Sequence, residues 1–292
     1  MQPCTQDAQD ILSALAGKAG FETFEETATG LKGYVQQALF DEDVLQQVLE
    51  GFPFENVALS YSIQEAEDKD WNEQWEQEGF EPICLPLPTS KGKGNLIIHD
   101  GRHLPSDISH QSSDIMIEID AHLAFGTGTH ETTRMICSTL LEMELAGTRV
   151  LDCGCGTGIL GICALKLGAA SAVGYDIDEW SADNTRHNAV INRVDDRLTA
   201  LCGDASVLAP FATTPDGSPS GFNLVMANIN RNILLNDMEH FRSVMAPHAQ
   251  LVLSGFYKND CALLESKAQS LGLSLKATRT DGDWACLLFS LD

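Results

Sequence analysis

The sequence predicts an α/β protein in which a small α+β domain precedes a larger domain built around a mostly parallel sheet. From residue 149 onward, short apolar runs alternate with segments of helical periodicity, a pattern typical of βαβ units. Residues 1–80 differ from the rest, since they carry seventeen Asp and Glu against three Lys and no Arg, out of a formal net charge of -24 for 292 residues. A chain of this length can bury two cores.

Residues 1–66 are expected to form the small domain. Ile11 and Leu15 lie on one face of a helix, and residues 20–26 and 31–37 are strand candidates. Asp41 is expected to cap a second helix, and the alternation in residues 57–63 predicts a half-buried strand. This order is ferredoxin-like without its first strand, so either the start is truncated or the sheet is smaller.

Residues 67–94 are expected to connect the two domains, and residues 95–292 to form the larger one. The connection begins with a predicted short acidic helix that carries Trp71 and Trp75, and it continues into a passage rich in Pro, Lys and Gly. The strand candidates that follow are 96–100, 115–119, 149–153, 171–176, 197–202, 222–228, 249–255, 273–279 and 284–290.

A glycine loop follows the strand at 149–153. The strand ends around Asp152, and Gly154, Gly156 and Gly158 form a tight loop that opens a helix, so a ligand can approach the backbone closely. Asp176 ends the next strand, where its carboxylate can accept hydrogen bonds from both hydroxyls of a ribose. The motif predicts a nucleoside site.

Two features of this loop favour S-adenosylmethionine over a dinucleotide. The dinucleotide pattern requires a glycine at the position of Ile159, and the carboxylate of Asp152 suits a sulfonium or ammonium cation better than a pyrophosphate. The last two strand candidates also follow one another without a helix, and such a closing hairpin is typical of the seven-stranded, Rossmann-like class I methyltransferase sheet. We therefore expect that fold, with Asp152, Gly154, Gly156 and Asp176 at the cofactor.

Two further motifs flank this loop in the sequence. AFGTGTHETT, at 124–133, places a glycine-rich loop before a helix that Thr129 or His130 could cap, and the loop could cover the methionine end of the cofactor. Asn228 follows the fourth strand of the sheet, beside the expected position of the transferred methyl, although such an Asn is often a turn or cap residue. The Pro-Pro-aromatic run of enzymes that methylate bases or glutamine amides is absent.

Taken together, the acidic N-terminal segment, DWNEQW, AFGTGTHETT, LDCGCGTGILG, GYDID and the ANI turn resemble the ribosomal protein L11 methyltransferases in order and spacing. The resemblance covers most of the chain. It implies cofactor contacts at Thr133, Gly154, Asp176 and Asn228, with Asn228 also positioning the substrate and the methyl. It implies an N-terminal domain that recognises the substrate, and methylation of lysine and N-terminal amines of L11, a basic protein of the large subunit.

The remaining expectations come from charge and composition. The acidic front domain is expected to steer and dock a basic substrate, although the charge could serve solubility alone. A drier cleft near Phe125, Thr133 and Asn228 would hold the amine, with His130 as a weak candidate for a general base. A net charge of -24 disfavours nucleic-acid partners.

The apolar runs are too short to span a membrane, and no signal peptide is evident, so we expect a cytoplasmic protein. The cysteines show no CxxC pairing, and no metal is expected. The alternatives are an RNA or small-molecule methyltransferase on the same fold, and a cofactor-binding protein without catalysis.

Overall fold

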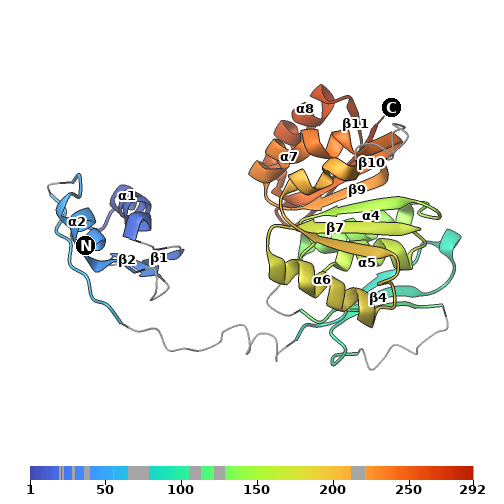
Figure 1. Cartoon of the computed structure of the whole chain (residues 1–292), viewed down its shortest axis with the longest axis horizontal. Helices are drawn as coiled ribbons and strands as arrows, with labels where there is room; N and C mark the ends of the chain where they lie inside the picture. Colours follow the sequence, from blue (N-terminus) through green and yellow to red (C-terminus); the bar gives the residue numbers. More distant parts are fainter. Residues whose placement is uncertain are drawn as a thin grey trace. The chain divides into compact units, whose positions relative to one another are not determined.

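The computed structural model divides into two compact units, Met1–Lys69 and Asp70–Asp292 (Figure 1). The structure describes residues 1–19, 21, 23–27, 30–35, 40–54, 56–64, 79–104, 113–121, 129–211 and 221–291. The expected helix with Trp71 and Trp75 lies outside the described residues, as does the loop containing Phe125.

The smaller unit is a helix, a hairpin and a second helix. Its elements are α1 (Gln6–Ala16), the 3-10 turn η1 (Gly17–Ala19), β1 (Thr23–Thr27), β2 (Gly30–Tyr34) and α2 (Glu42–Glu50). The buried Gln9 side chain donates to the carbonyls of Thr27 and Gly30, at 3.2 and 2.7 Å, and so ties α1 to the hairpin turn. α2 begins where expected, because the Asp41 carboxylate accepts from the Val44 amide at 3.0 Å.

The strand expected at residues 57–63 is not formed. Among these residues only Ala58 pairs, with Gln2, in an isolated bridge, and the side chains of Tyr61 and Ile63 are about half exposed. The alternation has a different cause, because Val57 and Leu59 face a pocket beside α2 rather than a neighbouring strand. The described part of this unit therefore has a two-stranded sheet rather than the ferredoxin-like arrangement.

The larger unit begins with a three-stranded sheet of β3 (Ile83–Pro86), β4 (Asn95–His99) and β5 (Ile115–Glu118), in the order β3-β4-β5. The first of these strands falls within the residues expected to be a connection. Composition suggested a linker there, but Ile83 pairs with Ile98 and is 7% exposed, so apolar burial places this passage in the larger unit.

The main sheet has seven strands in the order β11-β12-β10-β9-β6-β7-β8. They are β6 (Arg149–Cys153), β7 (Ser171–Asp176), β8 (Leu198–Cys202), β9 (Phe222–Asn228), β10 (Met245–Tyr257), β11 (Leu273–Asp281) and β12 (Trp284–Leu291). β12 runs antiparallel to both of its neighbours, β10 and β11. The other neighbouring pairs, β10 with β9, β9 with β6, β6 with β7 and β7 with β8, are parallel. The expected closing hairpin is thus present.

Helices cover both faces of this sheet, as a parallel sheet requires. α4 (Glu131–Glu142), α5 (Ile159–Lys166) and α6 (Glu179–Ile191) contribute to one core, and α7 (Arg231–Ser243) and α8 (Cys261–Ser270) to the other. Successive residues of β6 alternate between the two cores, with Val150 in the first and Leu151 in the second. Short 3-10 segments η2 (Thr89–Lys91), η3 (Ala205–Phe211) and η4 (Lys258–Asp260) complete the described elements.

The strand order reverses at β6, which lies between β7 and β9. In open α/β sheets, the crevice outside the carboxyl ends of the strands at such a point is where ligands bind. Asp152, Asp176 and Asn228 lie at or near the carboxyl ends of these three strands. The topology therefore gathers residues from three expected motifs at one edge. None of the helices in the described ranges is both long and apolar enough for a membrane crossing.

Gly255 in β10 is expected to tolerate no side chain. Its φ is +90°, and an added Cβ would meet the Ile229 carbonyl oxygen at 2.5 Å and the Ile229 nitrogen at 2.8 Å. Gly255→Ala should therefore lower the free energy of unfolding by about 2–5 kcal/mol, from the left-handed backbone and the backbone clash together. Gly272→Ala is the control, because φ is +79° there but no atom lies within 4 Å of the added Cβ. It should cost only about 1–2 kcal/mol in urea unfolding, and equal losses in the two variants would contradict the clash.

Candidate active site

The glycine loop between β6 and α5 has the backbone that only glycine adopts readily. Gly154, Gly156 and Gly158 have φ values of +70°, +52° and +79°. A Cβ on Gly154 would lie 2.4 Å from Cγ2 of Ile229, and Gly158 is the N-cap of α5. These positive φ values bend the chain tightly at the end of β6, as the sequence predicted.

Asp176 is held against this loop. Its Oδ2 accepts a hydrogen bond from the Gly156 amide at 3.0 Å, and its Oδ1 accepts one from the Asp178 amide at 3.2 Å. The amides of Gly154 and Cys155 both donate to the Tyr175 carbonyl, at 2.9 and 3.0 Å. The end of β7 and the glycine loop therefore form one hydrogen-bonded body, which fixes the position of the carboxylate.

Asp152 is a buried carboxyl beneath the loop, with 1% of its surface exposed. Its Oδ2 accepts from the Gly161 amide of α5 at 2.9 Å, whereas its Oδ1 has no partner among the described residues. Burial raises the pKa of Asp152 to about 8, against the lowering effect of the Gly161 hydrogen bond, and the nearby Asp176 raises it further. A cation bound close by would stabilise the charged form.

Thr133 of α4 and Asn228 of β9 meet on the side of β6 opposite to β7. His130 caps α4, its Nδ1 accepting from the Thr132 amide at 3.3 Å, and this places Thr133 in the first turn, 3% exposed. The Asn228 side chain donates from Nδ2 to the Thr133 hydroxyl at 3.3 Å. The buried Oδ1 of Asn228 has no hydrogen-bond partner within the described ranges. It is therefore an oriented acceptor.

An asparagine ladder on α6 was not expected from the sequence. Asn184, Asn188 and Asn192 are buried, and their side chains bond the backbone of residues 118–120. Asn188 also donates to the Thr157 carbonyl of the glycine loop at 3.0 Å. The signal was the spacing of three Asn at every fourth position of a helix. The ladder therefore ties residues 118–120 to α6 and to the cofactor loop.

The predicted residues thus form two contacting pairs, Gly156 with Asp176 and Thr133 with Asn228, with Asp152 beneath the loop. They fit S-adenosylmethionine, because the buried oxygens of Asp152 and Asn228 that lack partners in the described structure could accept hydrogen bonds from its polar groups. The glycine positions of the loop would also let its nucleoside approach the backbone. Cys153 and Cys155 are buried, and burial raises the pKa of both thiols. Among the described residues, no group of three or more His, Cys, Asp or Glu could hold a metal ion.

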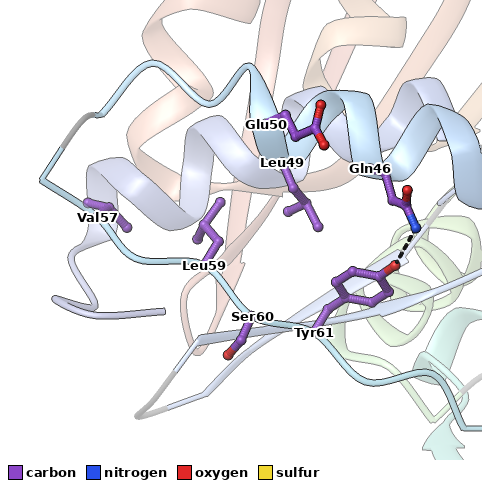
Figure 2. A pocket seen from close by; sticks show the side chains of 7 residues that line it. All are labelled: Gln46, Leu49, Glu50, Val57, Leu59, Ser60 and Tyr61. Carbon is purple, nitrogen blue, oxygen red and sulfur yellow. Dashed lines mark hydrogen bonds between the residues drawn. The ribbon is translucent and has the colours of Figure 1, made fainter.

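The smaller unit has a pocket of its own, shown in Figure 2, with a volume of about 460 Å³. It lies between α2 and the extended segment after it. Leu49, Val57 and Leu59 give it apolar walls, and Glu50 adds a carboxylate. The Tyr61 hydroxyl donates to Oε1 of Glu42 at 3.1 Å, so the rim is acidic and hydrogen-bonded.

Comparison with known proteins gives consistent matches. The family model described as Ribosomal protein L11 methyltransferase (PrmA) matches residues 5–291. The chain is 39% identical over 287 residues to a protein of Phocaeicola vulgatus named ribosomal protein L11 methyltransferase, covering 98% of this chain and 95% of that one. A protein of the same name from Porphyromonas gingivalis is 42% identical over 289 residues, covering 98% and 92%.

A solved structure supports the fold. The crystal structure of ribosomal protein L11 methylase from Lactobacillus delbrueckii subsp. bulgaricus superposes with a TM-score of 0.58 at 24% identity. The match covers 73% of this chain and 100% of that chain. The fold of this part of the chain is thereby shared with a solved structure.

The buried carboxyl of Asp152 predicts a pH-dependent stability. Its pKa in the folded protein, about 8, exceeds the ordinary value of 3.8, so the folded state holds the proton more tightly than the unfolded state does. The stability of the wild type should therefore fall as pH rises from about 4 to about 8, by an amount on the order of several kcal/mol. Asp152→Asn keeps an acceptor for Gly161 and should lack this fall. Urea unfolding of both proteins without ligand at several pH values tests this, and parallel pH profiles would contradict it.

Proposed function

Because the chain belongs to the ribosomal protein L11 methyltransferase family, we propose that it transfers methyl groups from S-adenosylmethionine to lysine and N-terminal amines of ribosomal protein L11. The observation that carries the proposal is the family match over residues 5–291, which includes the glycine loop, Asp176, Thr133 and Asn228. An enzyme with this substrate would work in the cytoplasm, where ribosomal proteins are made. It needs no membrane and no direct contact with nucleic acid.

The cofactor would be held by the residues gathered at the ends of β6, β7 and β9. Asp176, already oriented by Gly156, would accept hydrogen bonds from the ribose hydroxyls. The loop amides at Gly154 and Gly156 would contact the nucleoside side, and Asp152 would offset the positive charge of the ligand. Thr133 and Asn228 would lie at the methyl end. When bound, S-adenosylmethionine supplies an electrophilic methyl group on a sulfonium.

The residues of this chain would position the amine rather than react with it. A lysine amine must lose its proton before it can attack, which costs about 4.6 kcal/mol at pH 7. The Asn228 carbonyl oxygen can accept a hydrogen bond from the amine and direct its lone pair, and Thr133 keeps that oxygen in place. Being neutral, the amide does not favour the ammonium form as a carboxylate would.

The smaller unit would dock the substrate. Residues 1–69 carry a formal charge of -10, from thirteen acidic and three basic residues. The pocket beside α2 adds apolar walls to this charge, with Glu50 among its lining residues. A basic segment of L11 with an apolar side chain would fit that chemistry.

Asp176→Asn tests the cofactor site. The substitution removes the charge that strengthens the hydrogen bonds to the ribose, each worth about 1.5–3 kcal/mol. We expect cofactor affinity, measured by calorimetry, to fall ten- to a hundredfold, and label transfer to fall at subsaturating cofactor. Asp183→Asn, an exposed residue of α6 paired with Arg186, serves as the control. A cofactor affinity equal to that of the wild type would show that Asp176 does not bind the cofactor.

Transfer of a labelled methyl group from S-adenosylmethionine tests the function itself. In a mixture of purified ribosomal proteins and ribosomal RNA, we expect the wild type to label L11, and mass spectrometry to find the label on lysine or the N-terminal amine. Label confined to RNA would overturn the proposal in favour of an RNA methyltransferase. Cofactor binding without any labelled product would point to a protein without catalysis.

Salt dependence tests the docking role. Affinity for L11 should weaken several-fold as the salt concentration rises from about 25 to about 150 mM, because exposed charges are screened over shorter distances. Glu50→Gln should weaken binding at low salt, whereas Asp196→Asn, with 77% of its side chain exposed in the larger unit, should leave it unchanged. Binding that is indifferent to salt would rule out electrostatic docking.

A further inference from the structure

An aromatic cluster of His130, Tyr257 and Trp284 lies where β10 ends and where α4 and β12 begin. The rings of Tyr257 and Trp284 stack with centroids 4.5 Å apart and an angle of 27°, and His130 meets Trp284 in a T-shaped contact at 4.7 Å and 71°. Tyr257 is 54% exposed. We propose that this cluster binds the acceptor amine of the substrate through its aromatic faces and so determines acceptor specificity. The proposal rests on the proposed function.

Two independent connections place the cluster at the methyl end of the site. Trp284 pairs with Tyr257 at the end of β10, and three residues earlier on that strand Ser254 pairs with Asn228. From the other side, the His130 carbonyl accepts from the Thr133 amide at 3.1 Å, and Thr133 bonds Asn228. The cluster is thus joined to Asn228 through the sheet and through α4.

Hydrogen bonds hold the backbone at Tyr257 and the ring of His130. The Tyr257 amide donates to Oδ2 of Asp260 at 3.3 Å, and the Lys258 amide donates to the Asp283 carbonyl at 2.9 Å, which joins the end of β10 to the start of β12. On the α4 side, the cap contact of His130 fixes its ring. Recognition by such pre-positioned rings costs little ordering on binding.

Most carboxylates near the cluster are paired with cations of this chain, and Glu131 lies 3.8 Å from Nδ1 of His130. Three carboxylates near the cluster are each paired with a cation of this chain: Asp260 with Arg231 at 2.8 Å, Asp281 with Arg134 at 2.9 Å and Asp283 with Lys258 at 3.5 Å. Paired carboxylates attract a substrate ammonium weakly. An aromatic face attracts the ammonium form, so this contact acts in binding, before the amine loses its proton beside Asn228.

This chemistry distinguishes amines from other acceptors. The ring faces attract an ammonium group and pack against the methylenes of a lysine side chain. They also favour an amine that already carries a methyl group, because methylation weakens the hydration of the cation while keeping its charge. The cluster is therefore expected to improve binding of the acceptor and retention of partly methylated forms, without affecting the cofactor.

The test compares Tyr257→Leu with Tyr257→Phe in the full chain, with L11 and S-adenosylmethionine as substrates. Tyr257→Leu keeps an apolar side chain but removes the ring, and we expect a three- to thirtyfold rise in KM for L11, the range of exposed to desolvated cation–π contacts. Mass spectrometry should show a shift toward the lowest methylation state. Tyr257→Phe restores the ring and should restore both readouts, and cofactor affinity should stay within about twofold in every variant.

Equal behaviour of the two variants, whether both active or both impaired, would overturn the proposal, because the ring would then not be the cause. If Tyr257→Leu lost cofactor affinity, the same comparison would be made at the second ring, between Trp284→Leu and Trp284→Phe. Equal behaviour of those two variants would again overturn the proposal. Leu263→Ala, an apolar residue of α8 that is 51% exposed, controls for loss of surface area. The wild-type reaction with L11 reports on the proposed function alone, and the ratio of variant to wild type reports on the cluster.

Discussion

The reversal of strand order at β6 is the constraint on which the site depends. Because β7 and β9 lie on opposite sides of β6, the residues that follow these three strands share one edge of the sheet. The Gly156–Asp176 hydrogen bond then joins two strand ends, and the Thr133–Asn228 bond joins a third to α4. The close approach of Ile229 to Gly154 and Gly255 requires glycine at both positions. With a different strand order these groups would lie apart, even if each loop and helix formed locally as it does here.

Charge is distributed so that its functions do not interfere. The acidic excess is concentrated in residues 1–80, where it can attract a basic partner. At the methyl end, the oriented acceptor is the neutral amide of Asn228, and rim carboxylates such as Asp260 are paired with cations of the chain. Burial raises the pKa of Asp152 to about 8, so the group is mostly neutral near pH 7, and a cation bound beside the loop would lower this pKa and stabilise the charged form. In the proposed function, the groups that attract the substrate are therefore not those that position its amine.

The features that the sequence analysis got wrong or missed all depend on contacts with other parts of the chain. The alternation at residues 57–63 correctly marks Val57 and Leu59 as lining a pocket, but among the described residues the backbone of this segment pairs only at Ala58, with Gln2. β3 was read as part of a connection because its neighbours are rich in Pro, Lys and Gly, yet pairing with β4 recruits it to the larger unit. The asparagine ladder of α6 was also missed, because its partners are backbone groups from a segment more than sixty residues away.

The sequence by itself determined the features that depend on neighbouring residues. Strand periodicity located all seven strands of the main sheet, and the glycines at 154, 156 and 158 required the positive φ values that the structure has, because these preferences are set within a few residues. Tertiary structure decided which of these features meet. Thr133 and Asn228 lie 95 residues apart, and the rings of His130 and Trp284 come together only when α4 packs beside the closing hairpin. Such contacts follow from strand order and helix packing, which no local pattern specifies.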